Sequence, residues 1–229
     1  MNEPPKQRWG CLQWGIAAVV LALLASLIIP WCNAISRMGD QTRAVSNCKQ
    51  IVLALKQYAN ENESAYPDGR ADIHSANQAF RELFKTGILK EENIFGCSNS
   101  EFLPDNDIGN APDFMRALSP GECHWMLVKG QSDESSGNMP LLFENTLDVS
   151  WPPRWAGSAP EGRRKRGQAW SVCGIIIGRN DGSVQMEKLR GDGTLDWRST
   201  KGLDTFGKKR KSWPAEQVER FSWLDIEEK

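Results

Sequence analysis

The N-terminal part of this 229-residue chain is dominated by apolar positions, and residues 9–36 contain no charged side chain. An α-helix of about 20 such residues crosses a hydrocarbon core of about 30 Å, so residues 9–32 are predicted to be a transmembrane helix. Lys6 and Arg8 lie immediately before the run. The positive-inside rule then predicts that residues 1–8 are cytoplasmic and that the rest of the chain is extracytoplasmic.

A cleaved signal peptide is the alternative interpretation of the same run. Cys32, Asn33 and Ala34 form a small-x-small site of the kind that signal peptidase cuts. Against cleavage, the run is longer than the usual signal core, and a helical pattern continues beyond it. Arg37 and Arg43 on the far side reduce the charge contrast on which the predicted orientation depends.

Beyond the apolar run, the pattern becomes that of an amphipathic helix. Apolar residues recur at spacings of three and four and form one stripe: Cys48, Ile51, Val52, Leu55, Tyr58 and Ala59. Polar residues such as Lys49 and Lys56 fall mostly on the other faces. The turn signal Tyr-Pro-Asp-Gly at residues 66–69 ends the pattern. The sequence therefore predicts an amphipathic helix within residues 33–66 that continues the first helix, with a kink near Pro30.

The rest of the chain predicts a small globular domain over residues 67–190. Residues 76–85 show helical spacing. Four apolar or alternating runs indicate strands: residues 124–128, 139–143, 172–177 and 183–189. Asn-Asp-Gly at residues 180–182 separates the last two and is a hairpin signal. The predicted fold class is α+β, with a long N-terminal helix packed on a small antiparallel β-sheet. Residues 191–229 form a polar tail, whose apolar residues are expected to cap a surface: Val218, Phe221, Trp223 and Leu224.

Three pieces of the sequence resemble one branch of the type IV pilins and type II secretion pseudopilins. Residues 46–62 read S-N-C-K-Q-I-V-L-A-L-K-Q-Y-A-N-E-N and are followed by Tyr66 and Pro67, as in that branch. Residues 93–98 and 174–184 are similar to two later stretches of it, in the same order. The resemblance implies a pilin-like fold and a structural role in which subunits pack through their N-terminal helices.

The N-terminus departs from the pattern of that family. Prepilin peptidase cuts after a Gly, and the mature chain carries a Glu at its fifth position. When Pro30 is aligned with the family's proline, Arg8 stands in place of the Gly and Gln13 in place of the Glu. We therefore expect the protein to keep its N-terminus.

The function expected from these features is that of a membrane-anchored, pilin-like or pseudopilin-like subunit or accessory of a type II secretion or type IV pilus-like assembly. The protein is expected in the cell membrane. Its expected partners are the lipid bilayer and other pilin-like subunits or the secretion machinery, and no nucleic acid. A stand-alone anchored binding domain on the same scaffold is the alternative, and the missing Glu favours it. Neither function involves catalysis.

One loop begins like a calcium site. Asp105, Asp107 and Gly109 have the alternating oxygen ligands and the glycine of such loops, but Arg116 stands where the terminal Glu belongs. A plain polar loop is the favoured interpretation. The net charge of −1 gives no global preference for nucleic acid. Two basic runs, at residues 163–166 and 208–211, are predicted to be solvated loops.

The six cysteines include no Cys-x-x-Cys pair. If the domain is exported, a disulfide among Cys97, Cys123 and Cys173 is permitted. The other interpretation is that they are small buried apolar side chains. A metal site from these cysteines and His124 is disfavoured, because Cys123 and His124 are adjacent and adjacent residues point apart in a strand. We expect no catalytic, cofactor-binding or metal-binding residues.

Overall fold

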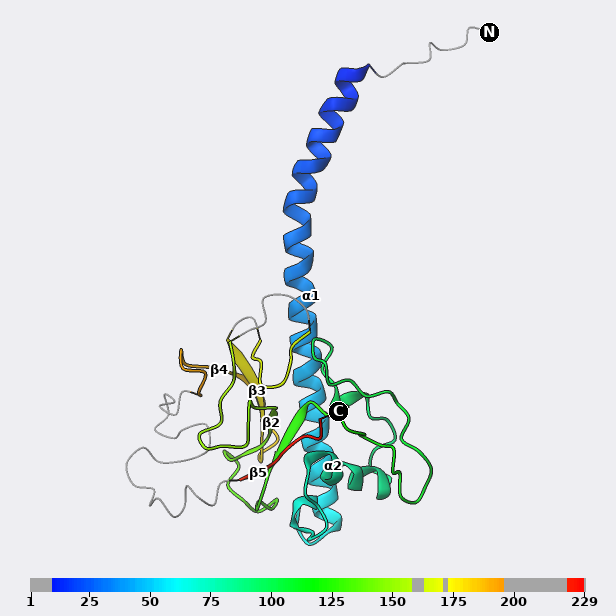
Figure 1. The fold of residues 1–229 in the computed structure, drawn as a ribbon, viewed down its shortest axis with the longest axis vertical. Coiled ribbons are helices and arrows are strands. Elements are labelled where there is room, and N and C mark those ends of the chain that lie inside the picture. Colours follow the sequence, from blue (N-terminus) through cyan, green and yellow to red (C-terminus); the bar gives the residue numbers. More distant parts are fainter. Residues whose placement is uncertain (1–9, 158–162, 171–172, 196–221, 229) are drawn as a thin grey trace. The chain divides into compact units, whose positions relative to one another are not determined.

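The computed structural model describes residues 10–157, 163–170, 173–195 and 222–228, without the side chains of residues 11–13, 27 and 30–34. The chain divides into two units, Met1–Gln41 and Thr42–Lys229, which are described separately. Helix α1, Cys11–Glu61, begins in the first unit and ends in the second (Figure 1). Within the part of the chain that the structure describes, no helix has a stretch that is both long enough and apolar enough to cross a membrane.

The second unit is an α+β structure, as predicted. Its five-stranded antiparallel sheet has the order β4-β3-β2-β1-β5. The strands are β1 (Trp125–Val128), β2 (Pro140–Glu144), β3 (Gly174–Arg179), β4 (Val184–Lys188) and β5 (Trp223–Leu224). The four strands expected from apolar and alternating runs are confirmed within a few residues. β5 comes from the predicted polar tail, where Trp223 and Leu224 are buried. Val218 and Phe221 lie outside the described residues.

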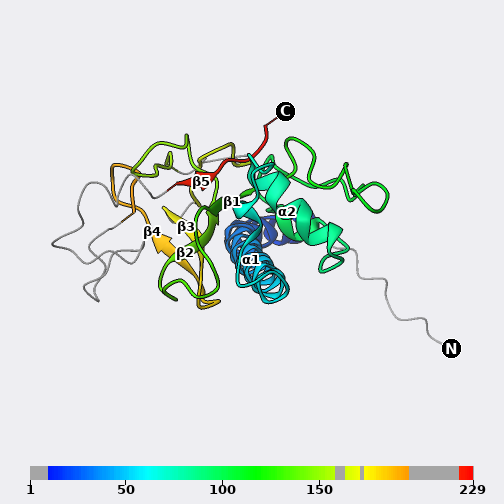
Figure 2. The same cartoon turned by 90° about the horizontal axis from the view of Figure 1, so that it is seen from below.

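One α-helix and two short 3₁₀ helices accompany α1 in the described part of the second unit. α2 is Ala76–Lys85, and the short 3₁₀ helices are η1 (Pro67–Gly69) and η2 (Asn93–Phe95). Ser75 caps α2, because its Oγ accepts the backbone N–H of Gln78 at 3.1 Å. Viewed from below, α1 lies next to both α2 and the sheet (Figure 2). The predicted helix over residues 76–85 is confirmed.

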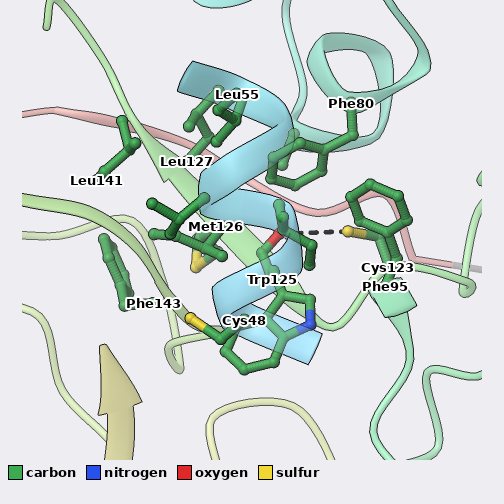
Figure 3. Close-up of a cluster of buried hydrophobic side chains, with 14 of the residues drawn as sticks. Cys48, Leu55, Phe80, Phe95, Cys123, Trp125, Met126, Leu127, Leu141 and Phe143 are labelled. Atoms are coloured by element: carbon green, nitrogen blue, oxygen red, sulfur yellow. Dashed lines mark hydrogen bonds between the residues drawn. The ribbon is translucent and has the colours of Figure 1, made fainter. Parts of the chain in front are cut away.

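The core forms where α1 packs on the sheet and on α2. The predicted stripe of α1 is buried, whereas Leu53 on another face of the same helix is 51 % exposed. In Figure 3, Leu55 of α1 lies beside Leu127 of the sheet, and Phe80 of α2 lies near Phe95. The Phe80 and Phe95 ring centroids are 4.9 Å apart. The long helix thus forms the centre of the core of the second unit.

One glycine shows how closely α1 approaches the sheet. A Cβ atom added to Gly178 of β3 would lie 2.6 Å from Cγ2 of Val52 and 2.9 Å from Sγ of Cys48. Both distances are shorter than any normal carbon contact. A side chain at this strand position would therefore push the helix away from the sheet.

Candidate functional site

A buried carboxylate, Glu144, is the centre of the most densely connected polar cluster. Its Oε1 lies 3.0 Å from Nε2 of His124 and 3.0 Å from Nη2 of Arg164. Nε1 of Trp170 and the backbone N–H of Ile176 donate to the same carboxylate at 3.0 Å and 2.9 Å. The Glu144 side chain is 1 % exposed. Its oxygens are therefore saturated by donors from within the fold.

Strand register brings two members of this cluster together. β1 pairs with β2 so that Trp125 faces Glu144, which places His124 next to the carboxylate. Asn145, just after β2, holds His124 in place, because its backbone N–H and its Nδ2 both donate to the carbonyl of His124. The cluster is therefore a product of the sheet's register rather than of one local motif.

Arg164 comes from a loop and enters the core fully. Its guanidinium carbon lies 3.9 Å above the Trp170 ring, and Nη1 donates to the carbonyl of Gln168 at 3.2 Å. Nη2 is shared between Glu144 and Sγ of Cys97, each at 3.0 Å. The predicted solvated loop over residues 163–166 is therefore wrong at Arg164, which is 2 % exposed, because its charge is neutralised inside the protein. It is wrong at Arg166 as well, which forms ion pairs with Asp225 and Glu228, whereas residues 208–211 lie outside the described residues.

The protonation states of the cluster follow from its geometry. Burial alone would raise the pKa of Glu144, but the Arg164 charge and the donors from His124 and Ile176 lower it below its usual range. Burial lowers the pKa of His124. The Glu144 carboxylate is thus ionised and His124 is neutral at neutral pH, so that one negative charge faces one positive charge.

Three side chains of the cluster have the spacing of a metal site, but the Arg164 guanidinium already contacts two of them. The ligand atoms of Cys97, His124 and Glu144 lie within 4.8 Å of one another. The Arg164 guanidinium contacts two of the three. Burial raises the pKa of the Cys97 thiol to about 11, so the thiol keeps its proton at neutral pH, whereas metals bind the thiolate. The cluster therefore fits an internal ion pair better than a metal.

A serine, a histidine and a glutamate also follow one another in the cluster. Oγ of Ser100 lies 3.0 Å from Nδ1 of His124, whose other nitrogen faces Glu144. This is the order of groups in a nucleophilic triad. However, Ser100 is fully buried, and its Oγ accepts the backbone N–H of Phe102 at 3.2 Å. Because a buried serine cannot reach a substrate, Ser100 has a structural role in this arrangement.

The four cysteines that the structure describes in the second unit form no disulfide. Cys48, Cys97, Cys123 and Cys173 are free thiols, and Cys173 is the exposed member of this set. Sγ of Cys123 donates to the carbonyl of Trp125 at 3.3 Å. Within the described residues, Cys97 and His124 thus meet as a metal site would require, whereas Cys123 and Cys173 do not join them.

The loop that begins like a calcium site uses its carboxylates internally. Oδ1 of Asp105 accepts the backbone N–H of Asp107 at 2.7 Å. Oδ2 of Asp107 forms an ion pair with Nη1 of Arg116 at 2.8 Å. Arg116, the residue in place of the terminal Glu, therefore supplies the positive charge from within the chain.

Asp105 also approaches two other carboxylates, which the sequence did not indicate. One oxygen each of Glu92, Asp105 and Glu122 lie within 4.8 Å of one another. The fully buried Glu92 accepts the backbone N–H groups of Asn106 and Leu118 at 2.6 Å and 2.9 Å. Burial raises the pKa of Glu92, and Asp105 raises it further against these two donors. Glu92 thus ties the two ends of the loop together.

The pieces of sequence that resemble pilins meet in the structure. Nδ2 of Asn47 in α1 donates to the carbonyl of Gly96 at 3.3 Å, and Nζ of Lys49 donates to the carbonyl of Gly182. The hydroxyl of Tyr66 donates to Oδ1 of Asn180 at 2.7 Å. Residues 46–67 thus fasten the long helix to both later pieces of the resemblance.

The predicted hairpin turn at residues 180–182 is confirmed and is structural. Gly182 has a φ of +82°, which glycine adopts without strain. Oδ1 of Asp181 accepts the backbone N–H of Ser183 at 2.8 Å. The Asp181 carboxylate therefore shapes the turn between β3 and β4.

In comparisons with protein-family models, curated proteins and solved structures, nothing matches this chain. The class that the described residues define is an α+β structure built around one long helix, with a buried polar cluster centred on Glu144.

Proposed function

We propose that this protein is a membrane-anchored, pilin-like subunit or accessory of a type II secretion or type IV pilus-like assembly, and that it acts by subunit packing. The observation that supports the anchor is the surface of α1 in the first unit. The large apolar side chains that the structure describes from residue 14 to residue 29 are exposed, from Val20 at 47 % to Trp14 at 66 %, on all sides of the helix: Trp14, Ile16, Val19, Val20, Leu21, Leu23, Leu24, Ile28 and Ile29. A helix that is apolar on every side needs an apolar surrounding, and lipid supplies one.

The second unit supports the pilin-like part of the proposal. A long helix whose C-terminal half packs on an antiparallel sheet is the arrangement that the resemblance implies. The contacts of Asn47 and Lys49 explain why those residue types stand in the helix segment that resembles pilins. In this proposal the apolar halves of neighbouring helices bundle together, and the α+β units lie outside the bundle.

Membrane fractionation tests the anchor. We expect the full chain to remain in the membrane after alkaline carbonate extraction. A Leu21→Lys, Leu24→Lys variant should be released, because each lysine at a bilayer centre costs about 2.5–3.5 kcal/mol. Leu53→Lys is the matched control, since Leu53 is an exposed leucine of the same helix in the second unit. Recovery of the unaltered chain in the soluble fraction would refute the anchor.

Cross-linking in membranes separates the proposal from its alternative. A subunit that packs through its helix should give a ladder of cross-linked multimers, whereas a stand-alone anchored binding domain should remain a monomer. Arg8 and Gln13 favour the alternative, because they replace the residues by which pilins are processed and assembled. N-terminal sequencing of the extracted protein should find Met1; a chain starting at Trp9 or Cys11 would show processing.

A further inference from the structure

The 3₁₀ helix that follows α1 buries a carboxyl group of which one oxygen has no partner. Asp68 lies in η1 and is 7 % exposed. Its Oδ2 accepts the backbone N–H of Gly130 at 2.7 Å. Its Oδ1 is also closed off from solvent, but has no hydrogen-bond partner among the described residues. Because an ionised carboxylate can only accept hydrogen bonds, an unpaired oxygen of this kind destabilises the folded state.

A second unpaired acceptor belongs to the residue that follows Gly130. Oε1 of Gln131 is buried and likewise has no partner in the described part of the chain. Nε2 of the same amide donates to the carbonyl of Pro140, which identifies Oε1 as the accepting end of the side chain. The contact between η1 and residues 129–133 therefore contains two buried acceptors and no donor for either of them.

Backbone contacts hold these two segments together beside the unpaired oxygens. The backbone N–H of Asp133 donates to the carbonyl of Ser64 at 2.9 Å. Ala65 and Ser132 form an antiparallel bridge. Residues 129–133 belong to the connection between β1 and β2, and residues 64–69 follow α1 directly. The contact around Asp68 thus joins the end of the long helix to the sheet.

The charged groups around η1 do not neutralise Asp68. Those of α1, of α2 and of the neighbouring loops are paired with one another: Lys56 with Asp133, and Arg70 and Lys85 with Glu82. Tyr66 keeps its proton, because burial raises the pKa of its hydroxyl. Burial raises the pKa of Asp68, although the Gly130 N–H and the charge of Lys129 lower it. Lys129 is exposed, whereas Oδ1 of Asp68 is closed off from solvent.

We propose that Asp68 is a proton-operated latch between η1 and residues 129–133. When the carboxyl is protonated, its Oδ1–H donates to Oε1 of Gln131, so that one proton satisfies both unpaired acceptors. When the carboxyl is ionised, the Gly130 N–H is the hydrogen bond that remains to stabilise the buried charge, and the contact weakens. The inference goes beyond the proposed function and does not depend on the membrane anchor.

The pH dependence of this latch has a defined sign. Folding raises the pKa of Asp68 above its ordinary 3.8, so the folded chain binds this proton more tightly than the unfolded chain does. The stabilisation that Asp68 contributes is therefore complete below about pH 3.8 and is lost as the pH rises through the raised pKa.

Asp68→Asn tests the latch, because asparagine keeps an acceptor for Gly130 and places an N–H donor where the proton would be. In the full chain in detergent, this variant should melt about 3 °C or more above the unaltered chain at about pH 7. The difference should shrink as the pH falls toward about 4, and groups such as His124 cancel because they titrate in both chains. Asp72→Asn is the matched control and should not raise the melting temperature, since Asp72 is exposed and pairs with Arg70.

Two outcomes of the melting experiment would overturn the proposal. A lower melting temperature of Asp68→Asn at every pH would show that the fold needs the negative charge, as it would if Oδ1 bound a cation. A difference that does not change with pH would show that Asp68 does not exchange a proton on folding.

A carbon-13 NMR titration of the aspartate carboxyl groups gives a second measurement in the folded full chain. The Asp68 signal is the one that Asp68→Asn removes, and its midpoint should lie above the ordinary 3.8. Asp72 should titrate below it, because the Arg70 side chain lowers the pKa of Asp72. Gln131→Met removes the proposed acceptor and should lower the Asp68 midpoint. An Asp68 midpoint at or below 3.8, or one that Gln131→Met leaves unchanged, would contradict the latch.

Discussion

Replacing Glu144 by glutamine tests whether the buried ion pair holds the second unit together. Glutamine keeps the shape of the side chain but removes the negative charge. The guanidinium of Arg164, 2 % exposed, then loses the carboxylate that neutralises it. The new amide also presents two donors toward His124, Trp170 and Ile176, whose N–H groups already donate to this side chain.

The expected loss is large because the charge that remains cannot reach water. Removing one partner of a buried ion pair costs about 3–5 kcal/mol, a large part of the about 5–15 kcal/mol that stabilises an ordinary domain. Arg164→Met should cost a similar amount, because it leaves the Glu144 carboxylate buried without its cation. The double variant should lose less than the sum of the two, by about 0.5–3 kcal/mol, since neither charge then remains unpaired.

Denaturant unfolding of the full chain in detergent, followed by circular dichroism, measures all three variants. Asp107→Asn is the control, because Asp107 and Arg116 form an ion pair whose side chains are both largely exposed. Such pairs contribute about 0–1 kcal/mol. If Glu144→Gln costs no more than this control, or if the two single losses simply add in the double variant, then the buried pair does not stabilise the unit as argued.

Leu55→Asp should destabilise the second unit by about 3 kcal/mol or more, because it buries a charge. Leu53→Asp, on an exposed face of the same helix, should change the stability by no more than about 0.5 kcal/mol. Equal melting temperatures of the two variants would contradict the assignment of faces. Gly182→Val should cost about 1–3 kcal/mol through strain at its positive φ, and Asp181→Asn, which still suits the turn, should change the melting temperature little. Burial lowers the pKa of His124 below its ordinary 6.5, so as the pH falls this histidine takes up a proton in the unfolded chain before it does so in the folded chain. The free energy of unfolding therefore keeps its full value above pH 6.5 and decreases as the pH falls below 6.5. Melting temperatures from about pH 8 to about pH 5 should therefore fall less in a His124→Asn variant, and parallel curves would show that His124 does not titrate in this way.

Elements with a clear local period were predictable from the sequence. The stripe through Leu55 and the helix over residues 76–85 have three- and four-residue spacing, and both are buried on the expected faces. The Asn-Asp-Gly turn at residues 180–182 was predictable because few residue types tolerate its backbone angles. In each case, residues close in sequence determine the structure.

Features set by distant partners were not predictable. Arg164 lies in a basic run that suggests a solvated loop, and its burial depends on a carboxylate 20 positions earlier in the chain. Lys56 was expected on a polar face, but its Nζ pairs with Asp133 and donates to the carbonyl of Asn180 at 3.0 Å. β5 has two residues, too few to show a period, and is defined by its pairing with β1.

The contacts of the long helix show which of its residues are explained by the fold of a single chain. Asn47, Lys49 and Tyr66 lie in the most pilin-like stretch, and each donates a hydrogen bond to another part of the same α+β unit. Those residue types are therefore explained by the fold of one chain, so their resemblance to pilins carries no information about whether copies associate. In the proposed assembly, the contacts between helices would have to come from the exposed apolar side chains of the first unit, such as Trp14, Leu21 and Ile29.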